Sequence, residues 1–479
     1  MSAIHLDGTR ELTIQGWAAN LVDNLDNLYM MGMTADFEEA IKVAIDIDLS
    51  KSTMEHVNVF ETTIRHLGGL LAAYDLSGDK RLLDKAKEFG EMLLVPFDTP
   101  NRMPITRWKF HEALNGPQEA DTTVLVAEIG SLSMEFTRLS QITGDMRWYD
   151  AVDRITRIFE KQQHDTHLPG MWPVVVNAKE EDFTQDTFFT LSAMSDSLYE
   201  YLPKLHALMG GVDPVFEKMY NGSMTTAIKH NIWRPMTPDD ANILMSGNVR
   251  AKGDHKPVLQ PQGQHLVCFA GGMFALGGKL FGIPEHVEIG KKLTDGCIWA
   301  YKALPLGIMP EVYQMIPCKS RTTCHWDEQE WRAAVKGIHQ ETDDVDDLIK
   351  KFRLPKGFTE IGDARYILRP EAIESVFILY RITGDDRYLD AAWNMFTAIV
   401  NATETRLANA ALADITYSHE QLRRGEAGNV NTQMDSMESF WMAETLKYFF
   451  LIFSEPDVIN LDAWVFNTEA HPFKRQLPV

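Results

Sequence analysis

Apolar residues recur along most of the chain at intervals of three and four, which is the spacing of one face of an α-helix. The clearest example is the stretch 60–74, in which Phe60, Ile64, Leu67 and Leu71 fall on one face. Because this spacing dominates the sequence and the alternation typical of strands is rare, the pattern predicts a mainly helical chain.

Other segments add to this picture. Helices are also predicted over 16–32 and 37–47. Only 171–176 and 463–468 have the composition of strands, being rich in Val, Trp and Phe.

A charged pair stands near the start of the helix at 60–74. Glu61 and Arg65 are one turn apart, and Gly68 and Ala72 continue the same row. On an ordinary amphipathic helix such a pair would be a surface ion pair, but this helix has almost no polar face. A carboxyl group held beside apolar surface changes its protonation, which suits acid–base chemistry. The small residues would let a neighbouring helix come close.

Three predicted helices end in the same way, with a Gly-Asp pair after an apolar row. Gly suits the left-handed position after a helix, and Asp can cap the helix that follows. The glycines lie 66 and 240 residues apart, which fits a helical hairpin of about 60 residues repeated roughly seven times. The pairs are 78–79, 144–145 and 384–385, and the helices predicted after them are 80–94, 146–159 and 386–400.

Within each predicted hairpin the first helix is the more apolar and carries isolated carboxylates, whereas the second is charged along one face. This difference is expected of two concentric rings, with buried inner helices and half-solvated outer helices. We therefore predict an all-α fold in which residues 1–479 form a single α/α-barrel domain. A superhelical solenoid is the alternative, but acidic residues at matching levels of the inner helices favour a closed central cavity.

Charge and composition exclude some functions. The formal net charge is −22, which argues against a nucleic-acid partner, because phosphates need a basic surface. The most apolar run, 448–453, is too short to span a bilayer. The sequence contains no HExxH, GxSxG, P-loop or EF-hand pattern. The negative charge instead suits a neutral or cationic substrate, or simply solubility.

The cysteines and sequons point to a compartment. The four cysteines are Cys268, Cys297, Cys318 and Cys324; they can pair in three ways, and none forms a CxxC motif. Two sequons begin at Asn221 and Asn401. Together these features favour the secretory pathway, in the endoplasmic reticulum or Golgi lumen, or secretion.

Several acidic residues lie at the starts or in the middle of apolar helices. Glu311 and Glu371 each follow a proline, and a proline at the first helical position followed by an acid is a common helix start. That explanation does not account for Arg369 and Glu374 on either side of Glu371. A basin of carboxylates with arginine and aromatic residues is how proteins bind a sugar and hydrolyse its linkage, with one carboxyl protonating the leaving oxygen and another activating water.

Six motifs together carry a resemblance to a known family. In chain order they are Phe60–Arg65 with Leu67–Gly69, Asp196–Tyr201, His265–Phe269, Arg369–Glu371 with Glu374–Ser375, Glu438–Phe440 with Ala443–Thr445, and Phe466–Pro472. The chain resembles the class I α1,2-mannosidases, glycoside hydrolase family 47. The motifs follow the family's order across nearly the whole chain, so the resemblance is specific.

This resemblance implies an (α/α)7 barrel plugged by a C-terminal β-hairpin. It also implies Ca²⁺-dependent, inverting removal of terminal α1,2-linked mannose from high-mannose N-glycans. Carried over by motif, Glu61 matches the proton-donor candidate and Glu371 the base that activates water. Asp196 and Glu311 match two further catalytic positions. In inverting enzymes the two working carboxyls stand about 6.5–9.5 Å apart, which leaves room for a water.

The resemblance also implies a metal site and sugar contacts. Thr468 matches the residue that binds Ca²⁺ through its hydroxyl and carbonyl oxygens. Since calcium takes six to eight oxygens, waters and sugar hydroxyls would complete the shell. The carboxylates implied to hold those waters are Glu61, Glu371, Glu374, Glu444 and Glu469, and the residues implied to contact the sugar are Arg65, His265, Arg369 and Phe440. Cys268 and Cys297 match the family's disulfide, and Cys318 and Cys324 are close enough in sequence to pair.

Some features depart from the family pattern or leave alternatives open. The family usually has a further helix before the region of Trp17, so a barrel helix is either missing or trimmed at this end. Met194 occupies a position where members differ and where specificity is partly set.

A glycan-binding or partner-dependent member acting in glycoprotein quality control is one alternative. An unrelated α/α-barrel enzyme, such as a sugar epimerase or an (α/α)6 glycosidase, is the other. We expect a monomer.

Overall fold

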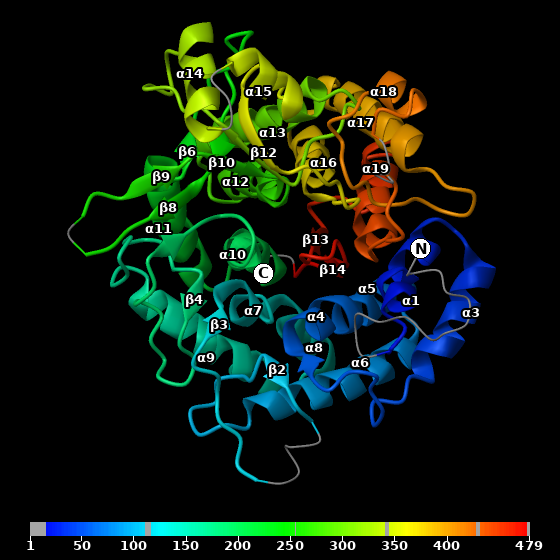
Figure 1. Ribbon diagram of the computed structural model, residues 1–479. Coiled ribbons are helices and arrows are strands. Elements are labelled where there is room, and N and C mark those ends of the chain that lie inside the picture. The colour runs from blue at the N-terminus through cyan, green and yellow to red at the C-terminus, as the bar shows by residue number, and fades with distance from the viewer. Residues whose placement is uncertain (1–15, 111–115, 254, 341–343, 428–431, 477–479) are drawn as a thin grey trace.

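The computed structural model describes residues 16–110, 116–253, 255–340, 344–427 and 432–476. Its helices form two concentric rings around a central axis (Figure 1). The inner ring has seven positions within the described residues, which confirms the expected (α/α)7 barrel. In chain order these are α1 (Ala19–Asp23) with α2 (Leu25–Met30), η2 (Thr62–Leu67) with α5 (Gly68–Ser77), α7 (Val126–Gly130) with α8 (Ser133–Thr143), α10 (Asp196–Leu208), η5 (Leu266–Cys268) with α12 (Phe269–Leu280), α16 (Glu371–Thr383), and η6 (Trp441–Thr445) with α19 (Leu446–Ile452).

The outer ring packs against the inner one, each outer helix following its inner partner in the chain. In the described residues it consists of α3 (Thr34–Ile45), α6 (Lys80–Leu94), α9 (Arg147–Gln162), α11 (Val215–His230), α13 (Pro284–Ala303) and α17 (Arg387–Thr403). Burial explains why the inner helices are more apolar in sequence than the outer helices. Nearly every residue of α12 is buried, whereas α9 buries one face that includes Trp148, Val152 and Ile155.

The Gly-Asp pairs end the inner helices as predicted. Gly78, Gly144 and Gly384 have φ values of 73°, 77° and 65°, which is the left-handed region that favours glycine. Asp79 accepts a hydrogen bond from the backbone N–H of Arg81 at 2.9 Å and caps α6, whose bounds match the prediction. The helices α9 and α17 begin one residue later and run three residues further than predicted.

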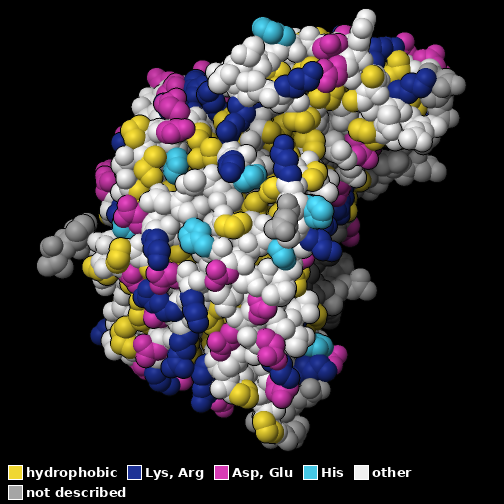
Figure 2. Space-filling model, turned by 90° about the vertical axis from the view of Figure 1, so that its left-hand side faces the viewer, with side chains coloured by type: hydrophobic (Ala, Val, Ile, Leu, Met, Phe, Trp, Pro, Cys, Tyr) yellow, Lys and Arg dark blue, Asp and Glu magenta, His cyan; other side chains and the backbone are white. Residues whose placement is uncertain are grey.

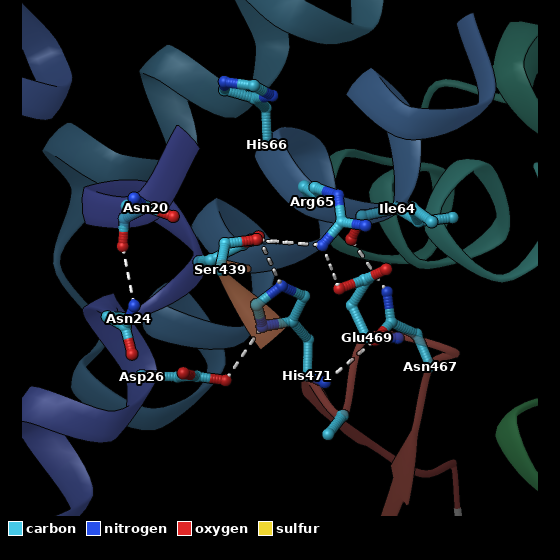
Figure 3. Close-up of polar contacts among 12 residues, drawn as sticks. Asn20, Asn24, Asp26, Ile64, Arg65, His66, Ser439, Asn467, Glu469 and His471 are labelled. Carbon is cyan, nitrogen blue, oxygen red and sulfur yellow. Dashed lines mark hydrogen bonds and ion pairs between the residues drawn. The ribbon is translucent and has the colours of Figure 1, made fainter. Parts of the chain in front are cut away.

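The helix predicted over 16–32 is interrupted. It forms as α1 and α2, and Asn24 lies between them with φ −104° and ψ 0°. The side-chain amide of Asn24 donates to the carbonyl of Asn20 at 2.6 Å (Figure 3). This local bond competes with the helical backbone, which apolar spacing alone does not reveal.

The ring closes between its first and last helices. The amide of Asn27 on α2 donates to the carbonyl of Met442 at 2.7 Å, and Lys447 Nζ on α19 donates to Asp26 Oδ2 at 2.7 Å. Gly69 makes room for α1, because a Cβ there would lie 2.6 Å from the carbonyl oxygen of Val22. The expectation of a missing or trimmed helix concerns residues before Trp17, of which 1–15 lie outside the described residues. The single-domain assignment for 1–479 stays a prediction.

Short antiparallel strands join the helices, and most of them were not predicted. Of the stretch 171–176 only β4 (Val175–Val176) is a strand, and 463–468 contains β13 (Trp464–Phe466). Most of the others span two or three residues, too few to show alternation, while β11 and β12 span four and six. They are β1 (Val57–Asn58), β2 (Arg107–Trp108), β3 (Val124–Leu125), β5 (Phe188–Phe189), β6 (Ile232–Trp233), β7 (Met245–Ser246), β8 (Asn248–Arg250), β9 (Val258–Gln260), β10 (Gln262–Gln264), β11 (Val312–Met315), β12 (Phe358–Asp363) and β14 (Pro472–Lys474). They pair as β1–β2, β3–β4, β5–β8–β9, β6–β7, β10–β11–β12 and β13–β14.

A C-terminal hairpin fills the middle of the ring, as expected. Strands β13 and β14 pair with Trp464 opposite Lys474, and both lie inside the inner ring (Figure 1). The side-chain amide of Asn467 at the hairpin tip donates to the carbonyl of Ile64 at 3.0 Å. Gly68 permits this approach, because a Cβ there would lie 2.7 Å from that amide nitrogen. The small residues of this helix therefore admit the hairpin as well as a helix.

The remaining elements lie outside the two rings or join their helices. They are α4 (Val59–Glu61), η3 (Val95–Phe97), α14 (Glu328–Ile338), α15 (Val345–Lys351) and α18 (His419–Arg423). Two disulfides form: Cys268–Cys297, as expected, and Cys318–Cys324, a pairing that the sequence left open. Among the described residues, no helix combines the length and apolar character that crossing a membrane requires.

Candidate active site

A cavity of about 280 Å³ opens in the middle of the barrel, above the hairpin tip. Ten of the twelve site residues predicted from the sequence line it. These ten are Glu61, Arg65, Asp196, Arg369, Glu371, Glu374, Phe440, Glu444, Thr468 and Glu469. The other two, Glu311 and His265, each contact one of the ten. Four inner helices and the hairpin tip therefore bring together residues that are up to 408 positions apart in the chain, from Glu61 to Glu469.

Two π-helical turns shape one wall of the cavity. Both η2 and η6 depart from α-helical hydrogen bonding, and such bulges are frequent at functional sites. Glu61 directly precedes η2, and its backbone N–H donates to Asn58 Oδ1 at 3.2 Å. Arg65 Nε donates to Glu61 Oε2 at 2.8 Å, so the pair noted in the sequence faces the cavity.

The opposite wall is built around Arg369 and Glu371. Arg369 Nε donates to Glu311, and Arg369 Nη1 lies 3.6 Å from Glu371 Oε1. His265 Nδ1 lies 2.9 Å from Glu371 Oε2, while its Nε2 lies 2.8 Å from the hydroxyl of Tyr301. Glu311 and His265 therefore do not line the cavity themselves, but each orients a residue that does, Arg369 and Glu371 respectively.

Backbone strain occurs at two positions beside the cavity. Leu368, just before Arg369, has φ 69°, and Met194, two residues before Asp196, has φ 74°. Non-glycine residues in this region cost about 1–3 kcal/mol and cluster at functional sites. Met194 is also exposed and lines the cavity, so it lies where an incoming ligand would pass.

Two carboxyls in the cavity have pKa values shifted in opposite directions. Burial raises the pKa of Asp196 to about 7, and the charges of Glu200 and Glu371 add to this, although the Ser197 backbone N–H opposes it. For Glu371 burial also favours the neutral form, but the hydrogen bond with His265 and the Arg369 charge outweigh it and hold the pKa below its usual value. Near neutral pH the first group keeps its proton readily and the second is ionised.

The floor of the cavity crowds carboxyls together. Burial, and then the charge of Glu469, raise the pKa of Glu444 well above its usual range. Burial also raises the pKa of Glu469, against the charge of Arg65, and that of Glu374, against the charge of Lys204. The floor therefore crowds carboxyls that favour their protonated forms, and these carboxyls offer oxygen atoms to a cation.

Thr468 lies at this floor, at the tip of the hairpin. Its backbone N–H donates to the hydroxyl of Tyr201 at 3.3 Å. Across the residues that the structure describes, no group of three or more His, Cys, Asp or Glu side chains could hold a metal ion directly. A cation here would need ligands of another kind, such as a hydroxyl, a carbonyl or waters.

Phe440 offers an apolar surface beside these charges. It is half-buried at the start of η6, and the guanidinium of Arg369 lies 5.9 Å from its ring centroid. A ring exposed at the wall of a polar cavity can pack against the C–H face of a sugar.

The sequence reasoning missed two cavity carboxyls, Glu128 and Glu200. Glu128 is paired with Arg107 from β2, and burial raises its pKa. Glu200 lies one turn after Asp196 and pairs with the buried Lys204. The i, i+4 spacing from Asp196 could have revealed Glu200. Nothing in the local pattern links Glu128 to Arg107, because the two come from separate elements.

Comparisons with known proteins agree with this geometry. A model described as glycosyl hydrolase family 47 matches residues 4–475. The endoplasmic reticulum mannosyl-oligosaccharide 1,2-alpha-mannosidase of Homo sapiens is 33% identical over 471 residues, covering 95% of this chain and 58% of that protein. A mannosyl-oligosaccharide 1,2-alpha-mannosidase of Arabidopsis thaliana is 31% identical over 476 residues, covering 98% of this chain and 73% of that protein. The chain thus spans less than two thirds of the length of the human relative.

Solved structures share the architecture. The alpha-1,2-mannosidase from Trichoderma reesei superposes with a TM-score of 0.80 at 27% identity, covering 96% of this chain and 91% of that one. A cellobiose 2-epimerase from Bacillus thermoamylovorans B4167 superposes with a TM-score of 0.51 at 9% identity, covering 85% of this chain and 90% of that one, which shows a common fold alone.

Proposed function

The chain belongs to glycosyl hydrolase family 47, and from that premise we propose that it removes terminal α1,2-linked mannose from high-mannose N-glycans as a calcium-dependent, inverting exo-glycosidase. One observation carries the proposal. The cavity holds Asp196 with a raised pKa and Glu371 with a lowered one, which gives a proton donor and a base in one site. That is the pair of states that inverting hydrolysis of a glycosidic bond requires.

Glu371 is proposed as the base. It is ionised at neutral pH, and His265 and Arg369 fix its two oxygens. It would take a proton from the water that attacks the anomeric carbon, and the sugar would leave with inverted configuration. Glu311 would act through Arg369, as a positioning residue.

Two carboxyls are candidates for the proton donor. Glu61 matches the family position, but one of its oxygens already accepts a hydrogen bond from Arg65. Asp196 is buried, and its pKa of about 7 keeps it protonated where Glu371 is ionised. This contrast supports Asp196 as the group that protonates the leaving oxygen, with Glu61 and Arg65 orienting the sugar. Comparing Asp196→Asn with Glu61→Gln on a substrate whose leaving group needs no protonation would separate the roles, since only the true donor's variant keeps its rate.

Calcium fits the floor of the cavity. The groups that could bind a metal there are oxygens, and burial together with neighbouring carboxyls raises the pKa values of Glu444 and Glu469, a crowding that a cation would relieve. Thr468 would hold the ion through its hydroxyl and carbonyl oxygens, and Glu61, Glu371, Glu374, Glu444 and Glu469 would hold its waters. When bound, calcium would supply positive charge that polarises neighbouring oxygens.

The alternatives make different demands on the cavity. A member of this fold that only binds glycans, or that acts through a partner in quality control, would not need carboxyls with opposite pKa shifts. The sugar-epimerase alternative rests on a shared fold alone. The retained acid and base therefore favour hydrolysis.

The location is proposed on separate grounds. The human relative is named as an endoplasmic reticulum enzyme, and both cysteine pairs of this chain are oxidised. Because disulfides persist in oxidising compartments, we propose the secretory-pathway lumen, or secretion. A monomeric state stays a prediction.

The test is release of free mannose from a Man9 N-glycan by the purified chain, with calcium and then with excess chelator. We expect release that stops with the chelator and returns with added calcium, while circular dichroism confirms that the chain stays folded. If a folded, calcium-loaded protein releases no mannose, the hydrolase proposal is wrong. Calorimetry with the same glycan would then test the binding alternative.

A further inference from the structure

A buried cluster of charged residues lies behind the floor of the cavity, where the hairpin tip meets the first and last inner helices. His471 is completely buried there, with its ring between two aspartates. Its Nδ1 lies 3.0 Å from Asp26 Oδ2 (Figure 3), and its Nε2 lies 3.5 Å from Asp23 Oδ1. The Nδ1 contact has hydrogen-bond length, whereas Nε2 and Asp23 Oδ1 are at ion-pair distance without a hydrogen bond. Because a neutral imidazole has only one N–H, a carboxylate on each side of the ring favours the imidazolium form.

A neighbouring histidine shows that burial alone does not produce this state. His66 is also fully buried and comes directly after Arg65, but its ring points away from the cluster (Figure 3). It faces the carbonyl of Trp17 at 3.1 Å and stacks on Phe89. Burial lowers the pKa of His66 to about 4, whereas the carboxylates around His471 raise its pKa.

The cluster connects His471 to the cavity through Asp23. The other oxygen of Asp23 accepts from Ser439 Oγ at 2.6 Å and lies 3.4 Å from Arg65 Nη1. The same Arg65 nitrogen donates to Glu469 Oε2 at 2.6 Å and to Ser439 Oγ at 3.0 Å. Arg65 is therefore shared between a buried aspartate behind it and carboxyls that line the cavity.

The charge of His471 affects how Arg65 divides its contacts between Asp23 and Glu469. The cluster holds Asp23 and Asp26 behind Arg65, with Lys447 satisfying Asp26 at 2.7 Å. Asp23 has no lysine of its own, so without His471 its buried charge would be compensated by Arg65 alone. A buried, unpaired carboxylate is costly, and Arg65 would be drawn toward it and away from Glu469.

We propose that His471 is a positioning residue, which neutralises Asp23 so that Arg65 remains directed at Glu61 and Glu469 in the cavity. The hairpin would then do more than close the barrel, because the residue three positions after Thr468 sets the orientation of the arginine opposite. This inference rests on the proposed function for its kinetic consequence, although its structural part does not.

The first test is His471→Gln, with His286→Gln as the matched control. His286 is also buried, but it lies on α13 and contacts Tyr220, away from the cavity. We expect His471→Gln to lower kcat by about tenfold with a smaller change in KM, as loss of a residue that supports an active-site group does. His286→Gln should match the wild type. An unchanged kcat in His471→Gln would overturn the proposal.

A double-mutant cycle distinguishes positioning from a merely structural role. If His471 acts through Asp23, then His471→Gln should cause no further loss of kcat in an Asp23→Asn background. An equal loss in both backgrounds would contradict the proposal. Should His471→Gln fail to fold, Ser439→Ala tests the same link, with a reduced kcat expected in a protein that circular dichroism shows to be folded at the assay temperature, and an unchanged kcat counting against it.

A crystal structure of His471→Gln gives a readout that does not depend on activity. We expect the contact between Arg65 and Asp23 to shorten and the contact between Arg65 and Glu469 to lengthen. Unmoved Arg65 would overturn the inference even if the wild type releases mannose. A wild type that releases none would instead refute the proposed function and leave the structural result to decide this inference.

Discussion

Charged residues serve two different purposes in the outer ring and in the centre of the barrel. In the outer ring, Arg81, Arg147 and Arg387 each follow a Gly-Asp pair, and each bridges that aspartate to an acidic residue of another outer helix. In the centre, Lys447 and His471 both contact Asp26, and none of the three side chains is exposed to solvent. The same residue types occur in both regions, but their surroundings differ.

The difference lies in solvent screening. The side chains of Arg81 and Arg147 are 42% and 58% exposed, so water screens their pairs and the pairs contribute little to stability. The surface shown in Figure 2 likewise intersperses basic and acidic side chains. The central groups are desolvated, so their charges shift pKa values and hold neighbours in place. We therefore expect the charges at the surface to matter little and the charges at the centre to support the proposed chemistry.

The sharpest way to break the comparison is to remove one charge from each region. Glu371→Gln removes the proposed base from the cavity, and we expect kcat to fall by about 10²–10⁴-fold, because that is what a general base contributes. The matched control is Glu91→Gln, which removes an exposed partner of Arg147 and should leave kcat unchanged. Steady-state release of mannose measures both. Equal kcat values for the two variants would mean that a carboxylate in the cavity contributes no more to the rate than one at the surface.

The next effect concerns stability at the centre. Lys447→Met should lower the free energy of unfolding by about 3–5 kcal/mol, because it leaves Asp26 buried with one cation fewer. Urea denaturation followed by tryptophan fluorescence measures it. A change as small as that of a surface pair would show that water reaches this cluster.

The cavity carboxyls predict a pH profile. The pKa of Asp196 is raised to about 7, so its protonated form is present below this value and is lost as pH rises through it. The pKa of Glu371 is lowered, so this carboxyl stays ionised at pH values where an ordinary glutamate would begin to take up a proton. We expect kcat/KM to fall about tenfold per pH unit above about pH 7 and to hold on the mildly acidic side. A flat profile between about pH 6 and 9 would argue against Asp196 as the donor.

The smallest effect is expected at the surface. Arg81→Ala removes the bridge between Asp79 and Glu38, and we expect neither the unfolding midpoint nor kcat to change measurably. Differential scanning calorimetry and the mannose assay check this. A clear loss of stability would show that these exposed ion pairs stabilise the fold as the buried central pairs do.

The sequence predicts features that depend on local signals better than features that depend on distant contacts. The Gly-Asp endings and the spacing of apolar residues predict α6 to its bounds, because both signals are local. The break at Asn24 was missed, since a side-chain bond to Asn20 overrides the apolar spacing. Strands of two or three residues carry too little pattern to be recognised.

The site divides in a similar way. Motifs identify Glu61, Asp196 and Glu371, whereas Glu128 depends on an arginine that a distant strand supplies. The role inferred for His471 depends on contacts with α1 and α2, more than 400 residues earlier in the chain. Such long-range compensation of charge has no local signature.

The central claim is that the buried carboxyls of the cavity hydrolyse an α1,2-mannosidic bond with inversion. Proton NMR of the product during the first minutes of reaction tests this most directly, because the two anomers of free mannose give separate signals. The account predicts that β-mannose appears first, only with calcium present, and that the anomers then equilibrate. Release of α-mannose first, or no mannose from the folded, calcium-loaded protein, would contradict it.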